Sequence, residues 1–499
     1  MAIVTVNGTA YTVPRGTRLG KLLADKAVMS MPCGGHGRCG KCKVTARGAF
    51  SELSDTEKLL LTEAEIRQGI RLACCAVVEG DCSVSLTKAG DGQIRVWGDI
   101  PEFQLKPGVQ TCGFVLDIGT TTLAARLYDV HGAVLAEGSC LNPQSSWGAD
   151  VISRIEAAMD GADKAIAEAI CRATDSLLAG LSEAAGIPAA EIDGMVVTGN
   201  TVMLHLFTGT STEPLSHAPF AAERLFGETV AAGTLGITEL SPETKVYLAP
   251  CASAFVGADL ITALLASGIC ETDSTQLLAD IGTNGEMALW HRGELTCCST
   301  AAGPAFEGAG ISMGMGGSAG AIDRVSVQNG RLTAHVIGGG LPRGICGSGI
   351  VDAVACLLET GRIEETGYME EDAVMILPPV SLSRKDIRMV QLAKGAIHAG
   401  IRALLSSAGL DCGEVSRLVI AGGFGSYLDA ENAGKTGLLP AEMISRVHVV
   451  GNAALSGAAM LLLNQDYRAS CEQYAKLAKV LELSSDPVFS EEYMERMMF

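Results

Sequence analysis

The 499-residue sequence is poor in basic and in aromatic residues. Lysine and arginine total 37 against 56 aspartates and glutamates, so the formal net charge is −19 at pH 7. Because nucleic-acid binding depends on clustered positive charge, this balance argues against nucleic acid as a main partner. Only 4% of the residues are aromatic, whereas 60 are glycine. That composition is typical of an α/β protein with many tight turns between strands and helices.

Long hydrophobic runs are also missing. No segment approaches about eighteen uninterrupted apolar residues, so we expect neither a transmembrane helix nor a membrane partner. The first residues, 1–13, lack a basic region followed by an apolar block, and no secretory signal is visible. We therefore expect a cytoplasmic protein. Its length predicts two to four folding units, and a hydrophobic content of 48% is sufficient for sizeable cores.

Several of the 17 cysteines have the spacing of a metal site. The loop Cys33-Gly-Gly-His-Gly-Arg-Cys39-Gly-Lys-Cys42 holds three thiols, and Cys74 and Cys75 follow in a distant segment. A cluster of two irons needs four thiolates, and a glycine-dense loop can supply three while its N–H groups approach the sulfides. The fourth ligand must then come from the distant segment. The other cysteines, among them Cys140, Cys171, Cys297, Cys298 and Cys356, are expected to be small core residues.

The cysteine loop resembles the adrenodoxin-like branch of [2Fe–2S] ferredoxins, in which the first gap is five residues instead of four. The segment Arg71-Leu-Ala-Cys74 resembles the family motif, and this resemblance selects Cys74 over Cys75 as the fourth ligand beside Cys33, Cys39 and Cys42. A zinc site or a redox dithiol is the alternative, although zinc sites rarely have so glycine-rich a loop. His36, inside the loop, is a weak ligand candidate.

Residues 1–87 predict an N-terminal α+β domain with the β-grasp fold of a [2Fe–2S] ferredoxin. Asn7-Gly8 is a strong signal for a two-residue hairpin, and Ser54 with Glu57 predicts a capping box at the start of a helix. Residues 88–112 contain glycine, proline and charges with little periodicity, which predicts a linker.

An apolar strand that ends in an acidic-glycine-hydroxyl turn occurs twice in the rest of the chain. The copies are Asp117-Ile-Gly119-Thr120-Thr121-Thr122 and Asp280-Ile-Gly282-Thr283-Asn284-Gly285-Glu286. Turns of this kind offer N–H and hydroxyl groups to phosphate oxygens, and each aspartate can hold Mg²⁺ directly or through water. Two copies predict a duplicated α/β domain over residues 113–499, with halves at about 113–270 and 271–499 and a cleft between them.

Further glycine-rich turns follow the same pattern of strand and turn. They include Gly303 in the stretch 299–308, and Gly422, Gly423 and Gly425 after an apolar strand. Glycine at such a turn lets an adenosine lie against the backbone. Each turn alone is equally well explained as a tight connection between buried elements, and only their order along the chain favours a nucleotide site.

That order resembles the acetate and sugar kinase, heat-shock chaperone and actin superfamily, with its duplicated ribonuclease-H-like fold. Phosphate-1 corresponds to Asp117–Thr122, phosphate-2 to Asp280–Glu286, and the adenosine motif to Ile420–Ser426. With the N-terminal ferredoxin, the whole is similar to the reductive activators of corrinoid proteins, and the stretch 299–308 resembles that family's C-terminal domain. Many relatives have a longer linker and an extra middle domain, which we expect this chain to lack.

The resemblance implies an ATP-hydrolysing enzyme that transfers one electron from its [2Fe–2S] cluster to the inactive Co(II) corrinoid of a methyltransferase corrinoid protein and restores Co(I). ATP and Mg²⁺ are the implied cofactors. An upstream low-potential electron donor and a homodimer are the other implied partners. Asp117 and Asp280 would organise Mg²⁺ and water, and Glu286 would position the attacking water. The nucleotide-binding residues would be Gly119, Thr120, Thr121, Thr122, Gly282, Thr283, Asn284, Gly285, Gly303, Gly422, Gly423 and Gly425.

Three other functions are compatible with the same motifs. One is an ATP-driven electron donor like the activators of hydroxyacyl-CoA dehydratases, which share a [4Fe–4S] cluster between two subunits. The cysteine loop argues against it, and an iron count per chain distinguishes the two. The second is a carboxylate or sugar kinase with a redox-sensing domain, and the third is an ATP-gated binding or chaperone module.

Overall fold

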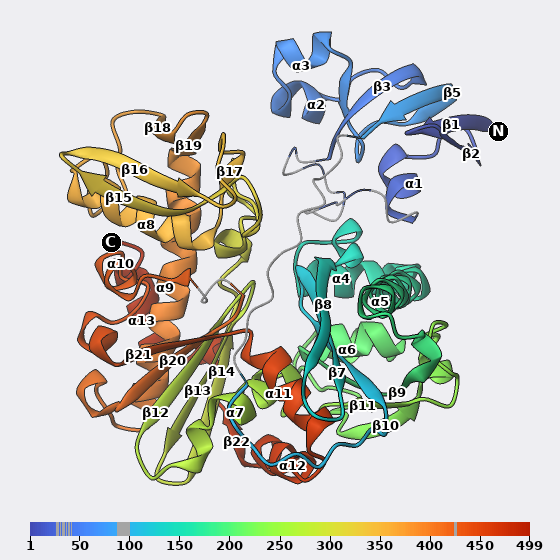
Figure 1. Ribbon diagram of the computed structural model, residues 1–499. Helices are drawn as coiled ribbons and strands as arrows, with labels where there is room; N and C mark the ends of the chain where they lie inside the picture. The colour runs from blue at the N-terminus through green and yellow to red at the C-terminus, as the bar shows by residue number, and fades with distance from the viewer. Residues whose placement is uncertain are drawn as a thin grey trace. The chain divides into compact units, whose positions relative to one another are not determined.

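The computed structural model describes residues 1–25, 29, 31, 35, 37, 40, 42–86, 100–423 and 427–499. The chain forms two compact units (Figure 1). The first consists of Met1–Asp91, Leu141–Thr174 and His205–Glu223, and the second of Gly92–Cys140, Asp175–Leu204 and Arg224–Phe499. None of the helices in the described ranges combines the length and the apolar character that a membrane span needs.

The N-terminal part of the first unit is a five-stranded sheet in the order β2-β1-β5-β3-β4. The turn between β1 and β2 is Asn7-Gly8, and both residues have positive φ, as predicted for this hairpin. Leu19, Leu23 and Leu72 have no exposed surface and fill the core under the sheet. The predicted α+β architecture is therefore confirmed. The elements are β1 (Ala2–Val6), β2 (Thr9–Val13), α1 (Leu19–Asp25), β3 (Lys43–Phe50), α2 (Asp55–Leu60), α3 (Glu63–Arg67), β4 (Ile70–Leu72) and β5 (Val78–Ser85).

The rest of the first unit is mostly helical. Two hydrogen bonds join the segment before the cysteine loop to the 3₁₀ helix η1: the Met31 N–H donates to the Ser145 carbonyl at 2.8 Å, and Ser146 Oγ donates to the Met29 carbonyl at 2.7 Å. The helical elements here are η1 (Pro143–Ser146), α4 (Val151–Ala157), the π-helical turn η2 (Ala158–Ala162), η4 (Glu213–Leu215), and parts of α5 (Asp163–Ala185) and α6 (Thr201–Thr208).

The second unit contains two six-stranded sheets in which five strands have the same order. The first is β10-β11-β9-β6-β7-β8 and the second is β21-β20-β12-β13-β14-β22. In each sheet the strand that carries the predicted turn, β6 or β12, pairs antiparallel with the next strand and parallel with a later one, β9 or β20. This repetition confirms the predicted duplicated ribonuclease-H-like fold.

The strands of the first sheet are β6 (Cys112–Ile118), β7 (Thr122–Asp129), β8 (Val134–Leu141), β9 (Ile192–Gly199), β10 (Glu228–Ala231) and β11 (Lys245–Leu248). Those of the second are β12 (Gln276–Ile281), β13 (Gly285–His291), β14 (Glu294–Thr300), β20 (Arg417–Ala421), β21 (Val447–Gly451) and β22 (Ala478–Val480). Smaller sheets consist of β15 (Ala321–Gln328), β16 (Arg331–Val336) and β17 (Gly344–Ile345), and of β18 (Ala373–Leu377) and β19 (Val380–Ser383).

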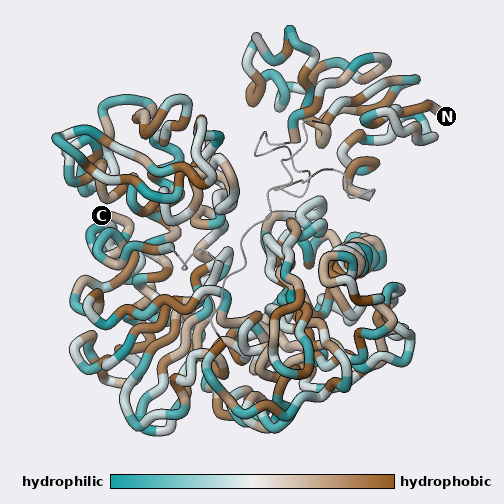
Figure 2. Tube along the Cα trace, in the orientation of Figure 1, coloured by the Kyte–Doolittle hydropathy of each residue, from teal (hydrophilic) through white to brown (hydrophobic). Residues whose placement is uncertain are grey.

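Helices pack against these sheets. They are α7 (Ala258–Ser267), α8 (Gly347–Glu359), α9 (Arg384–Ser407), α10 (Ala430–Lys435), α11 (Ala453–Leu463), α12 (Tyr467–Leu477) and α13 (Pro487–Glu495). Short 3₁₀ turns are η3 (Ala189–Glu191), η5 (Ala232–Leu235), η6 (Ile269–Glu271), η7 (Pro304–Glu307), η8 (Cys412–Glu414), η10 (Ala441–Arg446) and η11 (Leu483–Ser485). Figure 2 shows hydrophobic segments, in brown, along the central strands.

The cysteines outside the predicted cluster site mostly belong to these cores. Cys171, Cys297, Cys298 and Cys356 are buried, as predicted, whereas Cys140 is only partly buried. Burial in apolar surroundings raises the pKa of Cys356 to about 11. These buried thiols are therefore neutral at physiological pH, which fits a packing role.

The closest helix contact of the second unit joins α7 and α11. Every residue of α11 from Ala453 to Leu463 is buried, and a Cβ atom added to Gly457 would lie 1.9 Å from the carbonyl oxygen of Thr262 in α7. No side chain fits in that space. Glycine at 457 is therefore a requirement of the α7–α11 packing, although glycine in a helix interior is otherwise unfavourable.

We predict opposite effects for two Gly→Ala substitutions in helices. Gly457→Ala forces α7 and α11 apart and should lower the free energy of unfolding by about 1–3 kcal/mol, as overpacking does elsewhere. Gly180→Ala in α5 adds a Cβ atom to open space and should raise it by about 0.5–1 kcal/mol. Melting temperatures from calorimetry test both. Equal stabilisation by the two changes would contradict the described packing.

Candidate functional site

Two of the four predicted cluster ligands, Cys42 and Cys74, lie in the described part of the chain. Their Sγ atoms are 3.2 Å apart and both thiols are buried. The hydrogen bond between the two thiols lowers the pKa of Cys42 to about 7, and the same contact raises the pKa of Cys74. Two sulfurs bound to one tetrahedral metal at about 2.3 Å would be about 3.8 Å apart, so this pair is near that separation but slightly closer. Cys33, Cys39 and His36 lie outside the described residues.

Cys75 is close to the same group of thiols. Its Sγ lies 3.7 Å from that of Cys74, and its side chain is only partly buried. Of these two neighbours, Cys74 is the one whose sulfur and N–H both contact the sulfur of Cys42. These contacts favour Cys74 over Cys75, and that Cys74 is the fourth ligand stays a prediction.

A buried ion pair holds the strand that leads to Cys74. The Glu57 carboxylate, which has no exposed surface, accepts hydrogen bonds from Arg71 at 2.7 and 3.0 Å and from the Leu72 N–H at 3.0 Å. Burial acts to raise the pKa of Glu57, but the hydrogen bonds, that from Arg71 foremost, outweigh it and lower the pKa. Glu57 also closes the predicted capping box with Ser54, which is confirmed. Arg71 of the Arg-Leu-Ala-Cys motif thus fixes β4 against α2 and positions Cys74.

The two predicted phosphate turns are tight connections between paired strands. In the first, between β6 and β7, the Gly119 N–H donates to the Thr122 carbonyl at 3.0 Å. A Cβ atom on Gly119 would lie 2.7 Å from that oxygen, so glycine is needed for the turn. In the second, between β12 and β13, the Gly282 N–H donates to the Asn284 carbonyl at 3.0 Å. The turns have equivalent places in the two sheets.

Hydroxyl groups from the two turns meet at one carboxylate. Thr121 Oγ1 and Thr283 Oγ1 lie 3.0 Å apart, and both hydrogen-bond to Oε2 of Glu307, Thr121 at 2.9 Å. Glu307 is the last residue of η7. Beside them Thr120 is buried and accepts a hydrogen bond from Asn200 Nδ2 at 3.1 Å. The structure therefore brings the two predicted phosphate turns together, and the carboxylate of Glu307 accepts hydrogen bonds from both.

Four further carboxyl groups surround this point, and their pKa values are raised. Burial raises the pKa of Asp117 to about 6, that of Asp259 to about 7 and that of Asp280 to about 8, and it raises the pKa of Glu286 well above its usual range. The neighbouring negative charges add to the shifts of Asp259, Asp280 and Glu286. Asn452 Nδ2 donates to Asp117 at 2.8 Å and partly opposes its shift. Without a cation nearby, Asp259, Asp280 and Glu286 hold protons near neutral pH, whereas Asp117 holds one only to a small extent.

The carboxylates do not form a cage for a bare metal ion. In the ranges that the structure describes, no three His, Cys, Asp or Glu side chains converge closely enough to bind one. Mg²⁺ is usually held by one or two carboxylates, with water and substrate phosphates completing its octahedron. The arrangement thus fits a magnesium ion that arrives with a nucleotide. That Asp117 and Asp280 organise it stays a prediction.

The glycines predicted to bind the nucleotide have different surroundings. A Cβ atom on Gly422 would lie 2.8 Å from Oδ1 of Asp280, so this glycine borders the carboxyl group directly. Gly423 has open space, and Gly425 lies outside the described residues. The Gly303 N–H donates to the Thr283 carbonyl at 2.8 Å and holds its segment on the second turn. A Cβ atom on Gly285 would meet Ile397 of α9 at 2.3 Å, so packing by itself explains that glycine.

Three residues at the site were not among the predicted site residues. Glu307 lies in the recognised stretch 299–308, but only the fold shows that it contacts both threonines. Asp259 and Asn452 each follow a glycine closely, at the start of α7 and of α11. In the sequence, a glycine shortly before a polar residue at the start of a predicted helix could have indicated both site residues.

We predict that the free protein loses stability as the pH rises, because of the raised carboxyl pKa values. Folding raises the pKa of such a carboxyl group. Its contribution to stability is complete below the pKa of the unfolded protein, near 4, and is lost as the pH rises through the pKa of the folded protein. For Asp280 the loss extends to about pH 8. Asp280→Asn should therefore raise the melting temperature by about 2–4 °C at pH 8.5, and by little at pH 5.

The control for this measurement is Asp160→Asn, which changes an exposed aspartate. It should leave the pH dependence of the melting temperature unaltered. Both variants are measured without nucleotide or Mg²⁺. If wild type and Asp280→Asn melt with the same pH dependence, the proposed proton uptake at Asp280 is wrong.

Family models match almost all of the chain. The model described as "2Fe-2S iron-sulfur cluster binding domain" matches residues 4–79, "RACo middle region" matches 112–272, and "C-terminal domain of RACo the ASKHA domain" matches 274–499. The prediction that the chain lacks the family's middle domain was wrong. The middle region coincides with the first six-stranded sheet and its helices, which the sequence pattern had suggested to be one half of a duplicated domain.

Two curated relatives and one solved structure are similar over most of their length. "Corrinoid activation enzyme RamQ" of Eubacterium limosum is 36% identical over 419 residues, which are 78% of this chain and 70% of that protein. "[Co(II) methylated amine-specific corrinoid protein] reductase" of Methanosarcina barkeri is 26% identical over 415 residues, 77% of this chain and 76% of that protein. The structure entitled "Reductive activator for corrinoid,iron-sulfur protein" has a TM-score of 0.76 and 28% identity, and covers 100% of this chain and 98% of that one.

Proposed function

Because this chain belongs to the family of reductive activators of corrinoid proteins, we propose that it reduces the inactive Co(II) corrinoid of a partner protein to Co(I) and couples this to ATP hydrolysis. The main support for the proposal is that Thr121 and Thr283 both contact Glu307, among carboxyl groups with raised pKa values. The same chain also places Cys42 next to Cys74.

Cys33, Cys39, Cys42 and Cys74 would hold a [2Fe–2S] cluster, which supplies a single electron when reduced. The protein's own contribution there is structural. The ion pair of Glu57 with Arg71 keeps the Cys74 segment fixed, and the approach of Cys42 to Cys74 prepares two ligands. Since one electron leaves for each corrinoid reduced, a low-potential one-electron donor is the upstream partner that we propose.

In the nucleotide site, Thr121 and Thr283 would turn their hydroxyl groups from Glu307 to phosphate oxygens. Asp117 and Asp280 would accept hydrogen bonds from Mg²⁺-bound water, with Asn452 holding Asp117 in place. Glu286 is a candidate for positioning the attacking water. Glu307 is a second one, since its carboxylate already contacts both phosphate turns and would be released when they bind phosphate. Assembly as a homodimer is a further proposal, based on the family resemblance.

Adjacent cysteines provide a matched pair of variants for the redox activity. The Co(II) corrinoid protein is mixed with this protein, a low-potential donor and Mg-ATP, and the visible absorption of Co(I) is followed. Co(I) should form only with ATP. Cys74→Ala should slow its formation by more than about 100-fold, since even changes to residues that only support metal ligands cost about 10–100-fold. Cys75→Ala should keep most of the activity. Equal loss in both variants, or reduction without ATP, would contradict the proposal.

The role of Glu307 is tested by ATP hydrolysis. Glu307→Gln keeps the size of the side chain and should lower kcat by about 100-fold, the usual effect of losing a group that handles the attacking water. Nucleotide affinity should change little. Glu294→Gln, at an exposed glutamate of β14, is the control. An unchanged kcat in Glu307→Gln leaves Glu286 as the candidate, and transfer of phosphate to a small molecule instead of water would favour the kinase alternative.

A further inference from the structure

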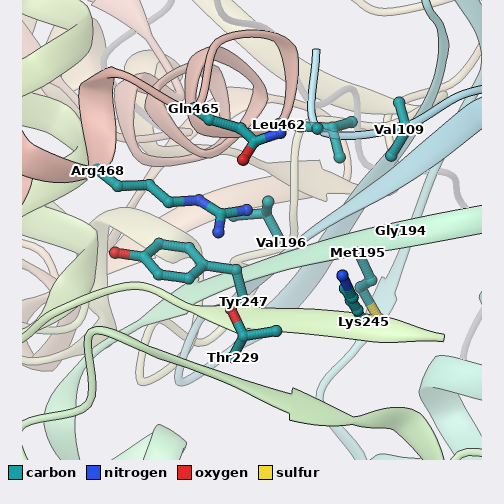
Figure 3. A pocket seen from close by; sticks show the side chains of 11 residues that line it. Val109, Gly194, Met195, Val196, Thr229, Lys245, Tyr247, Leu462, Gln465 and Arg468 are labelled. Atoms are coloured by element: carbon teal, nitrogen blue, oxygen red, sulfur yellow. The ribbon is translucent and has the colours of Figure 1, made fainter. Parts of the chain in front are cut away.

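A cavity of about 300 Å³ lies in the second unit, at the end of α11 that is farther from Asn452. Figure 3 shows side chains from β9, β11, α12 and the segment before β6 around it. Val109, Val196 and Leu462 supply apolar walls, and Lys245, Gln465 and Arg468 supply polar groups. This volume is at the lower end of the range for small-molecule sites.

The guanidinium group of Arg468 is held in place but lacks an acceptor. It lies over the ring of Tyr247 at 4.2 Å from the centroid, and its Nε atom is buried without a hydrogen-bond partner among the residues described. The side chain of Lys245 is exposed and has neither an ion pair nor a hydrogen bond within the same ranges. Arg468 is only partly buried, and burying its Nε–H group without an acceptor is costly because that hydrogen bond is not replaced.

No acidic side chain lines this cavity. That composition is unusual in a chain with 56 acidic residues against 37 basic ones. Burial without an anion also lowers the pKa of Arg468. Two cations, one of them a ring-stacked guanidinium, and an amide beside apolar walls are the features that recognise an organic anion.

The cavity is separate from the candidate nucleotide site. It is closed on one side by the segment 104–109, which is fixed to the junction of α11 and α12. The Lys106 N–H donates to the Leu463 carbonyl at 2.9 Å, the Gly108 N–H donates to that of Leu462 at 3.0 Å, and Asn464 Nδ2 donates to the Gln104 carbonyl at 2.7 Å. The nucleotide-site residue Asn452 caps the opposite end of α11.

We propose that this cavity binds a small organic anion. Its carboxylate or phosphate group accepts hydrogen bonds from Arg468 and Lys245, and its carbon skeleton contacts Val196 and Leu462. The stack on Tyr247 orients the guanidinium before the ligand arrives, which reduces the entropy lost on binding. The site does not depend on the function proposed above.

Isothermal titration calorimetry tests the proposal on the full chain at physiological ionic strength. Succinate and glycerol 3-phosphate are the two probes, one for each anionic group. At least one should bind with a Kd of about 1 mM or below, and saturating Mg-ADP should not displace it. Arg468→Met should weaken binding by about tenfold or more, the effect of losing one charge-assisted hydrogen bond.

Two further variants make the test independent of folding defects. Lys245→Met changes an exposed side chain at the cavity and should weaken binding by about threefold or more. Arg331→Met changes an exposed arginine of β16, away from the cavity, and should bind like wild type. Absence of binding for both probes at about 10 mM would overturn the proposal. So would displacement by Mg-ADP, or affinity unchanged in both cavity variants.

Discussion

Thr121 and Thr283 come from two different sheets, and both hydrogen-bond to Glu307. This contact requires that the turn after β6 and the turn after β12 face each other in register, which in turn requires the equivalent strand order of the two sheets. The nucleotide site is therefore a product of the duplication. Each half contributes one aspartate and one threonine-bearing turn, and η7 supplies the carboxylate that links them. The sheets, turns and helices around the site hold Thr121, Thr283 and Glu307 in position for this contact.

The same convergence explains the unusual electrostatics. Asp117 and Asp280 end equivalent strands, so they approach each other wherever the turns meet, and α7 adds Asp259 to the group. Burial is the main cause of the raised pKa values, and the neighbouring negative charges add to the shifts of Asp259 and Asp280. Fixed hydrogen-bond partners reduce the free-energy cost of burying these carboxyl groups together. Asn452 holds Asp117, and the close packing of α11 on α7 at Gly457 holds Asn452. Active sites commonly contain such locally unfavourable arrangements, which a bound ligand relieves.

Much of this arrangement was predictable from local sequence pattern. The hairpin at Asn7-Gly8, the capping box of Ser54 and the two acidic-glycine-hydroxyl turns each depend on a few adjacent residues. Their physical requirements are visible without the fold. Glu307, Asp259 and Asn452 were not predicted, because they reach the site only through the order of the strands. For Gly285 the motif position predicts a phosphate contact, and the approach of Ile397 gives a second reason for glycine there, so the contact stays a prediction. The middle region was missed because its strands repeat the pattern of the C-terminal half.

The carboxyl group cluster has a consequence for the energetics of ligand binding. Near neutral pH, Asp117, Asp259 and Asp280 hold part of their protons. If a magnesium nucleotide binds there as proposed, it must displace these protons, because a cation needs ionised ligands. Binding is then an exchange of protons for metal charge, and affinity increases with pH until the carboxyls are ionised. The released protons are taken up by the buffer. The heat of nucleotide binding will therefore depend on the buffer's own ionisation enthalpy. Enthalpies measured in two buffers differ by the number of protons released multiplied by the difference between the two ionisation enthalpies.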